Sequence, residues 1–318
     1  MTQLHNELME LARHLSPTPR EAKLRKEAVA QLEELSKELF PDSRLEVFGS
    51  AATGLCLPGS DVDVVLLKAP SRAIYRLAAA LRTRRMVDEI EVIASARVPI
   101  IKFTWRGNPV EIDVCFEEEG GPRTTEFIRG VLDVFPEVRP LTLAVKLLLA
   151  QRDLNSTHRG GMGSYLCFLT VLAYVQRARR ATLVMPSAGK AAGSGSLGAL
   201  LIGYLDFFGN VLNMEEVGVS LLEGGSLFRK RDRGWLSEER SFLLAMENPE
   251  NPDMDVGKNS REIRTVRRAF QHAHRVLSVA ALGAPLQPPE ADSGSARVRQ
   301  EHPATPSSSS ILARVLEL

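Results

Sequence analysis

One short stretch constrains the fold of this chain more than any other, because it places two acids in an apolar strand. Asp61 and Asp63 are separated by a single valine and are followed by the apolar run 64–67. Alternate residues of a strand point to the same face, so the two carboxylates should share a face. Carboxylates at a buried edge repel each other and lose hydration unless a cation lies between them. Their hard oxygen atoms suit Mg²⁺ or Mn²⁺.

The segment Phe48-Gly49-Ser50 upstream predicts a turn that faces a phosphate and opens a short helix. A glycine lets the backbone approach a phosphate closely. The start of a helix offers N–H groups and a positive dipole end, and Ser50 adds a hydroxyl donor. We therefore predict that Gly49 and Ser50 contribute to nucleotide binding.

A third acid is expected from a neighbouring strand. The segment 110–116 alternates polar and apolar residues, and it follows the apolar strand 97–104 across a turn. Glu111 and Asp113 should share one face of this strand. We choose Asp113 because it lies mid-strand between apolar neighbours. The sequence thus predicts a catalytic, metal-binding set of Asp61, Asp63 and Asp113, against the alternative of acids on a solvated strand face.

The composition is typical of globular proteins, with 44% hydrophobic and 25% charged residues. No apolar run approaches ~18 residues, so we expect no membrane span. Cys56, Cys115 and Cys167 are too widely spaced for a disulfide framework or a zinc pattern, which favours a reducing compartment. Because the net charge is only +1, any contact with nucleic acid must use local basic patches.

The hydrophobic periodicity changes along the chain and predicts an α+β fold of two domains. Residues 18–140 alternate between helical and strand patterns, which indicates a small mixed sheet backed by helices. From Leu141 the apolar spacing becomes helical, over 141–150, 164–179, 197–210 and 260–282. Residues 284–318 begin rich in Pro and Ser and are expected to form a disordered tail, in which 311–318 is either a short helix or a frayed end.

Several motifs in a fixed order resemble the DNA-polymerase-β-like nucleotidyltransferases and, within them, the non-canonical poly(A) polymerases of the TRAMP type. The resemblance covers roughly residues 4–282. It rests on Phe48-Gly49-Ser50, Leu57-Pro58-Gly59-Ser60-Asp61-Val62-Asp63, Arg139-Pro140-Leu141, Gln151-Arg152-Asp153-Leu154-Asn155, Gly163-Ser164-Tyr165 and Asp255-Val256-Gly257. It implies a nucleotidyltransferase domain, 18–140, inserted into an α-helical central (PAP-associated) domain made of 1–17 and 141–283.

The resemblance also implies an activity and partners. These are template-independent addition of adenylate from ATP to an RNA 3′ end by a two-metal mechanism, a role in RNA surveillance, and a nuclear location. A zinc-knuckle RNA-binding protein and an RNA helicase would be partners. Terminal uridylyl transfer and a catalytically inactive assembly subunit are the alternatives, and nucleotidyl transfer to a small molecule or protein would share only the first motifs.

Further nucleotide-binding residues follow from the resemblance alone. Lys146 and Ser164 would contact the phosphates, and Tyr165 would stack on the base. Asn248 stands where the family has an acid, and Met254, beside Asp255, stands where relatives have a polar residue or a histidine. Methionine packs well but is a poor hydrogen-bond partner, so we expect only a modest preference for ATP. A basic cluster at 229–233 is predicted to line the exit path of the RNA.

Overall fold

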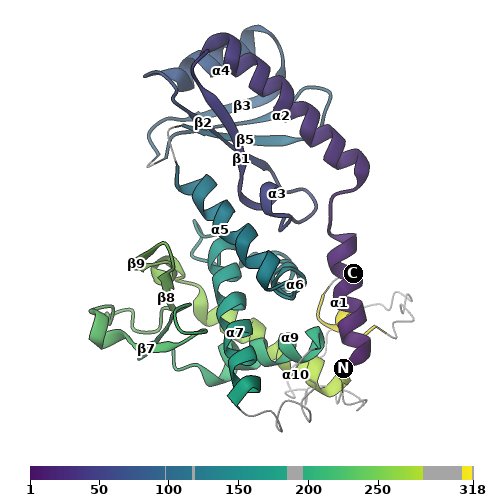
Figure 1. The fold of residues 1–318 in the computed structure, drawn as a ribbon, viewed down its shortest axis with the longest axis vertical. Helices are drawn as coiled ribbons and strands as arrows, with labels where there is room; N and C mark the ends of the chain where they lie inside the picture. The colour runs from purple at the N-terminus through teal and green to yellow at the C-terminus, as the bar shows by residue number, and fades with distance from the viewer. Residues whose placement is uncertain (97, 117–118, 185–195, 282–309, 317–318) are drawn as a thin grey trace, which may run out of the picture. The chain divides into compact units, whose positions relative to one another are not determined.

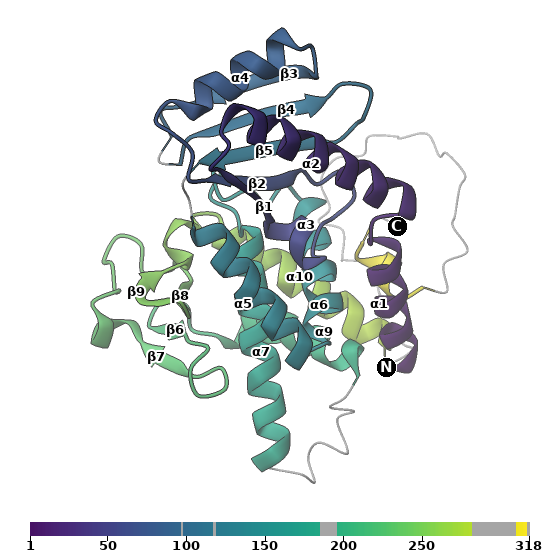
Figure 2. The same cartoon turned by 45° about the horizontal axis from the view of Figure 1, so that its top comes forward.

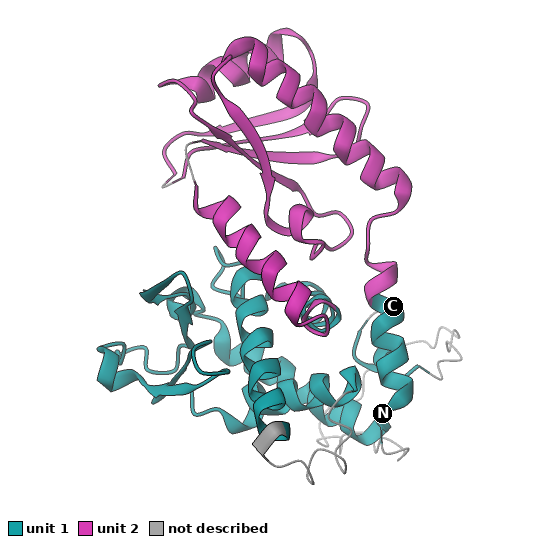
Figure 3. Cartoon of the chain, in the orientation of Figure 1, with its two compact units in different colours: residues 1–11, 140–318 teal, residues 12–139 magenta. Residues whose placement is uncertain are grey.

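The computed structural model describes residues 1–96, 98–116, 119–184, 196–281 and 310–316. The chain divides into two compact units, one of residues 12–139 (unit 2) and one of residues 1–11 and 140–318 (unit 1) (Figure 3). Each unit is described by itself. Among the described residues, no helix is both long and apolar enough to cross a membrane.

Unit 2 is built on a mixed sheet whose described strands run in the order β1-β2-β5-β4-β3. These strands are β1 (Arg44–Phe48), β2 (Val62–Leu67), β3 (Val87–Ile93), β4 (Ile100–Trp105) and β5 (Glu111–Phe116). β2 and β5 are parallel, and the other neighbours are antiparallel. The parallel pair lies inside the sheet, so its strands have neighbours on both sides and hold their side chains rigidly.

Two helices, α2 (Pro19–Leu39) and α4 (Ala73–Thr83), cover one face of this sheet (Figure 1; Figure 2). α2 begins at a capping box in which Thr18 and Glu21 bond each other's backbone N–H groups. The core beneath the helices takes every second residue of the strands, among them Val62, Val64, Leu66, Ile101, Phe103, Ile112 and Val114. This alternation places Asp63, Lys102 and Asp113 on the opposite face of the sheet, which β2 and β5 continue with the buried Val65 and Cys115.

The short helix α3 (Gly49–Thr53) and the longer α5 (Gly120–Val134) complete unit 2. The ring of Phe48 lies against the backbone of Gly121, so close that a Cβ at that glycine would lie 2.5 Å from Phe48 Cδ2. Thr125 accepts a 2.9 Å hydrogen bond from the N–H of Gly49. Helix α5 is therefore fixed directly against the end of β1.

Unit 1 is dominated by helices, as the periodicity predicts. They include α1 (Thr2–His14), α6 (Val138–Ala150), α7 (Ser164–Val184), α9 (Leu197–Asp206), the π-helical turn η1 (Phe207–Val211) and α10 (Ile263–Ala281). The ring of Tyr204 packs against Phe208 and Phe270, with centroid distances of 5.0 and 5.5 Å. Its hydroxyl lies 3.1 Å from the Thr170 hydroxyl, which satisfies the polar atom of a fully buried side chain.

The α+β fold class is confirmed, and the α-rich second domain also contains strands that the sequence did not predict. Unit 1 carries a small sheet in the order β7-β6-β8-β9 (Figure 2). Its strands are β6 (Val217–Val219), β7 (Leu227–Arg229), β8 (Ala245–Asn248) and β9 (Asn251–Asp255), with the 3₁₀ turns η2 (Lys230–Arg233) and η3 (Gly257–Asn259) nearby. Strands of three to five residues are too short for a period of two to show in the sequence.

The expectation of disorder over 284–318 does not hold at 310–316, where the short helix that was one of the two alternatives for 311–318 forms. Residues Leu312–Arg314 form a 3₁₀ turn, η4, and Ile311, Leu312, Val315 and Leu316 are buried. Both carboxylate oxygens of Glu7 accept backbone N–H bonds from this segment, at 3.0 Å from Ile311 and 2.7 Å from Leu312. Residues 284–309 of the predicted tail lie outside the described residues.

Candidate active site

Three carboxylates converge on the polar face of the unit 2 sheet. Asp61 precedes β2, Asp63 is the second residue of that strand, and Asp113 lies on β5. Each residue offers a carboxylate oxygen, and these oxygens all lie within 4.8 Å of one another. In the parallel pair, Asp63 is the direct partner of Asp113, so the strand register itself brings these two acids together. The three residues chosen from the sequence therefore form one half-buried cluster.

Gly49 fits against this cluster in a way that leaves no room for a side chain. Its φ of +68° lies in the left-handed region that favours glycine, and a Cβ there would lie 2.5 Å from Asp63 Oδ2. Its N–H is already bonded to Thr125, so its contribution is space rather than a hydrogen bond. Ser50 follows as the second residue of α3. Gly49 therefore lies next to Asp63, whereas the nucleotide contacts of Gly49 and Ser50 stay predictions.

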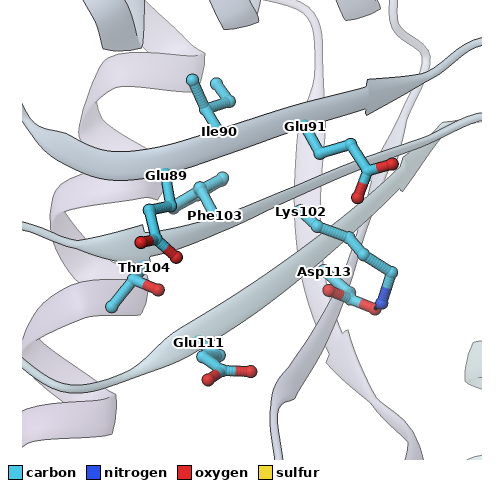
Figure 4. Close-up of a pocket in the computed structure, with 8 residues that line it drawn as sticks. All are labelled: Glu89, Ile90, Glu91, Lys102, Phe103, Thr104, Glu111 and Asp113. Carbon is cyan, nitrogen blue, oxygen red and sulfur yellow. Dashed lines mark hydrogen bonds and ion pairs between the residues drawn. The ribbon is translucent and has the colours of Figure 1, made fainter.

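Lys102 belongs to the same site and was not recognised in the sequence. It lies on β4 directly opposite Asp113, and its Nζ is paired with Asp113 Oδ2 (Figure 4). Its neighbours Ile101 and Phe103 are buried in the core on the other face, at 0% and 3% exposure. Strand alternation from those two apolar residues would have placed Lys102 on the acid face.

The ammonium of Lys102 and the carboxylates affect each other's protonation. Burial raises the pKa of Asp113, and the hydrogen bond from Lys102 offsets only part of this effect. Burial lowers the pKa of Lys102, but the bond to Asp113 and the charges of Asp61 and Asp63 outweigh it, so the net shift is upward. The cluster thus holds one cation in contact with Asp113, as a group of close carboxylates requires.

A cavity of about 350 Å³ extends from Asp113 and Lys102 along β3, β4 and β5 (Figure 4). Its walls carry the acids Glu89, Glu91 and Glu111. Thr104 contributes a hydroxyl, and Ile90 and Phe103 also line the cavity. The acid cluster is therefore open to a molecule that approaches along the polar face of the sheet.

A second group of predicted residues meets in unit 1. The Tyr165 hydroxyl on α7 donates a 3.2 Å hydrogen bond to Asn248 Oδ1, and Asn248 Nδ2 lies 3.5 Å from Met254 Sδ. Burial, with the charge of Glu250, raises the pKa of Tyr165, so its hydroxyl stays protonated and donates. Met254 is 36% exposed, so the group combines an aromatic ring, an amide and an accessible thioether. Tyr165 lies on the helix α7, whereas Asn248 and Met254 lie on the neighbouring strands β8 and β9, about 80 residues further along the chain.

The other predicted residues of unit 1 lie in different settings. Ser164 is exposed at the start of α7, whereas Lys146 on α6 is buried to 8% exposure. Asp255 Oδ1 accepts the N–H groups of Met246 and Gly257, at 2.9 and 2.7 Å. This oxygen joins the end of β9 to β8 and to the turn that follows. These bonds are structural, and the nucleotide contact of Asp255 stays a prediction.

The prediction that residues 229–233 line the path of the RNA was wrong for Lys230. Lys230 is 2% exposed, and its Nζ donates to backbone carbonyls. Arg233 pairs with the buried carboxylate of Glu247. Charge runs are usually solvated, and the carbonyl groups that surround Lys230 come from other segments, so local composition gave no sign of its burial.

The sheet order, the glycine turn beside Asp63 and the three convergent carboxylates define the polymerase-like nucleotidyltransferases as a class. The family described as poly(A) RNA polymerase, mitochondrial-like, central palm domain matches residues 4–132. The Cid1 family poly A polymerase description matches residues 196–254. The first match includes the three acids, and the second includes Asn248 and Met254.

Individual relatives agree with this class. Poly(A) RNA polymerase cid14 of Schizosaccharomyces pombe is 31% identical over 86% of this chain and 40% of its own length. The inactive non-canonical poly(A) RNA polymerase protein Trf4-2 of Drosophila melanogaster is 30% identical over 86% of this chain and 68% of its own. The polymerase core of TRAMP, an RNA surveillance complex, superimposes with a TM-score of 0.78 at 30% identity, over 88% and 87% of the two chains.

The chain therefore belongs to the non-canonical poly(A) RNA polymerase family. It spans 36–47% of the length of the first relatives that it matches. The Cid1 poly(U) polymerase has the same fold, with a TM-score of 0.75 at 24% identity.

Proposed function

We propose that this protein adds nucleotides to RNA 3′ ends without a template and prefers adenylate from ATP. The observation that carries the proposal is the convergence of Asp61, Asp63 and Asp113, whose oxygens lie within 4.8 Å, in a member of a polymerase family. A relative named as inactive is among the matches, but the present chain retains the three acids. This argues against a purely structural subunit.

The three acids fit a divalent metal. Their oxygens are close enough to share an ion, and the ammonium of Lys102 contacts Asp113, which shows that the cluster accommodates a positive charge. Asp61 and Asp63 would hold the ion on the nucleotide side, and all three acids would hold the ion at the RNA end. Mg²⁺ or Mn²⁺ bound there would lower the pKa of the attacking 3′-hydroxyl and would stabilise the charge on the leaving pyrophosphate.

The remaining residues would bind and orient the nucleotide. Gly49 allows Asp63 to lie close to the start of α3, where the backbone of Gly49 and the hydroxyl of Ser50 would face a phosphate. In unit 1, Lys146 and Ser164 would contact phosphates, while Tyr165 would stack on the base. We infer that residues 18–140 act as the catalytic domain and that 1–17 with 141–283 act as the central domain.

The base would meet Asn248 and Met254 at its edge. Because an amide can both donate and accept, Asn248 can pair with more than one base, and the Met254 thioether discriminates little. Terminal uridylyl transfer is therefore the second candidate. The shared fold with the Cid1 poly(U) polymerase is compatible with it but shows the fold alone.

The family supports a proposal about partners and location. The structural relative is the polymerase core of a complex, which supports assembly with other proteins. We propose a zinc-knuckle RNA-binding protein and an RNA helicase as partners, and the nucleus as the location.

A primer-extension assay tests the proposal. An end-labelled RNA primer is incubated with the protein, Mg²⁺ or Mn²⁺, and each NTP in turn, and the products are separated on a gel. We expect extension with all four NTPs and a preference for ATP of about tenfold, the scale of one weak contact. Extension from UTP in clear preference to ATP would contradict the adenylate assignment. An absence of extension with every NTP would contradict the proposed activity itself.

A further inference from the structure

A buried ammonium stabilises the small sheet of unit 1. Lys230, on η2, is 2% exposed, and its Nζ donates to the carbonyl oxygens of Met214, Ser241 and Leu243. Burial lowers the pKa of Lys230, and the charges of Asp255 and Glu215 oppose that shift. Since Leu243 lies two residues before β8, this side chain fixes the entry to the strand that ends in Asn248.

An ion pair between Arg233 and Glu247 also holds strand β8. Arg233, also on η2, pairs with Oε2 of Glu247 on β8. The Glu247 side chain is 1% exposed, and its Oε1 has no hydrogen-bond partner among the described residues. The Arg233 guanidinium lies 4.0 Å from the ring centroid of Phe228, which limits where it can move. The buried carboxylate therefore depends on Arg233 for its compensation.

The backbone around Asn248 is held by a third charged group. Asp255 is the strand partner of Glu247 and accepts the N–H of Met246 at 2.9 Å. Asn248 is the last residue of β8, and the two residues before it are held in place, Met246 by Asp255 and Glu247 by Arg233. Its Oδ1 accepts bonds from the Tyr165 hydroxyl at 3.2 Å and from the Glu250 N–H at 3.1 Å. A small movement of β8 would break this arrangement.

We propose that Arg233 is a positioning residue for base recognition, acting through its ion pair with Glu247 to hold Asn248 against Tyr165. This inference rests on the proposed function, in which Asn248 meets the base. Loss of the pair lets the end of β8 move, which weakens nucleotide binding and the choice between bases. The chemical step is unaffected, because the carboxylates that carry it belong to another part of the chain.

The experiment compares Arg233→Met, Arg233→Lys and the double variant Arg233→Met/Glu247→Gln with the wild type. The double variant removes the charge that Arg233→Met leaves buried and unpaired, so it stays folded even where the single variant does not. The exposed Arg240 of the same unit provides the control Arg240→Met. Steady-state kcat and KM are measured for ATP and UTP with saturating RNA primer, and each variant's unfolding temperature is recorded.

For the double variant we expect the KM for ATP to rise about tenfold, the scale of one lost polar contact. We expect kcat to stay within about twofold and the ATP-to-UTP ratio of kcat/KM to fall toward one. Arg233→Lys, which keeps the charge, should recover part of the ratio, and Arg240→Met should match the wild type. These results together support the proposal, because a general loss of stability would not change the ratio between bases.

An ATP-to-UTP ratio and a KM for ATP equal to those of the wild type, in a folded double variant, would overturn the proposal. That outcome leaves the proposed function standing, because the wild type still extends the primer. Absence of extension by the wild type with any NTP would overturn the proposed function and this inference together. The wild-type reaction therefore distinguishes the two failures.

Discussion

At the scale of single residues, the fit between Gly49 and Asp63 makes a sharp prediction. A Cβ at position 49 would lie 2.5 Å from Asp63 Oδ2, so Gly49→Ala must displace the carboxylate. We expect primer extension to fall at least ~100-fold, as misplacement of a reacting group by about 1 Å does. Gly59→Ala is the control, because Gly59 also has a positive φ (+76°) but no atom within 4 Å of the added Cβ. Equal losses of activity in the two variants would contradict the assignment.

Asp255 gives a prediction about pH. Burial raises the pKa of Asp255, and the bonds from Met246 and Gly257 with the charges of Lys230 and Lys258 offset only part of this. A carboxyl whose pKa is raised on folding favours the native state at pH values below its unfolded pKa, and loses that contribution as the pH rises through its folded pKa. Asn at this position keeps the accepting oxygen and mimics the neutral form.

The difference in unfolding temperature, Asp255→Asn minus wild type, should therefore become more positive from pH 4 to pH 7. Thermal unfolding followed by circular dichroism at several pH values measures this difference. If this difference instead became more negative from pH 4 to pH 7, the ionised carboxylate would stabilise the fold, which would contradict the prediction.

Residue-level prediction from sequence succeeded where a residue's own strand defined its setting. Asp63 and Asp113 could be placed because buried neighbours on alternate positions fix the face of each acid. Lys230 could not, since the three carbonyls that surround it come from Met214, Ser241 and Leu243 in other segments. Roles that depend on tertiary partners leave no local pattern.

At the scale of elements, the packing of α5 against β1 can be tested with two glycines of the same helix. A Cβ on Gly121 would lie 2.5 Å from Phe48 Cδ2, whereas a Cβ on Gly130 would meet no atom within 4 Å. We expect Gly121→Ala to destabilise the protein by ~1–3 kcal/mol through overpacking. Gly130→Ala should instead stabilise it by up to ~1 kcal/mol, because alanine is the better helix former. Urea unfolding measures both, and stabilisation by Gly121→Ala would contradict the described contact.

Elements were predictable in proportion to their length. The stripe of α2 (Pro19–Leu39) and the alternation of β2 (Val62–Leu67) extend over enough residues to show their period. β6 has three residues and β8 has four, so their pairing is set by tertiary contacts such as those of Lys230 and Asp255. That is why the small sheet, which carries Asn248, could not be predicted.

At the scale of the whole molecule, segments far apart in the chain complete unit 1. Leu4 and Leu8 of α1 are fully buried, and residues 310–316 are capped by Glu7 of the same helix. We expect Glu7→Ala to cost ~1–2 kcal/mol, the scale of a lost cap, and to release this segment. Hydrogen exchange at the N–H groups of residues 311 and 312 measures the release. Met9→Ala, at a position 54% exposed on the same helix, is the control. Unchanged exchange in Glu7→Ala would contradict the capping role.

The family and fold class could be predicted from motif order, because the motifs extend over most of the chain. The choice of nucleotide could not be predicted, since this chain departs from the pattern of the family it resembles at Asn248 and Met254, the residues that we propose for base recognition. Their hydrogen-bonding neighbourhood, including Tyr165, became visible only in the structure.

The central claim is that the three carboxylates hold metal for nucleotidyl transfer, and the Asp63→Ala variant tests it most directly. Extension of a labelled RNA primer with ATP and Mg²⁺ is compared between the variant and the wild type, and both are heated with and without Mg²⁺. We predict extension by the wild type and none by Asp63→Ala. The unfolding temperature of the metal-free variant should be unchanged or raised, because a repulsive carboxylate is removed, and the stabilisation by Mg²⁺ should be lost. Extension by Asp63→Ala above background would contradict the claim.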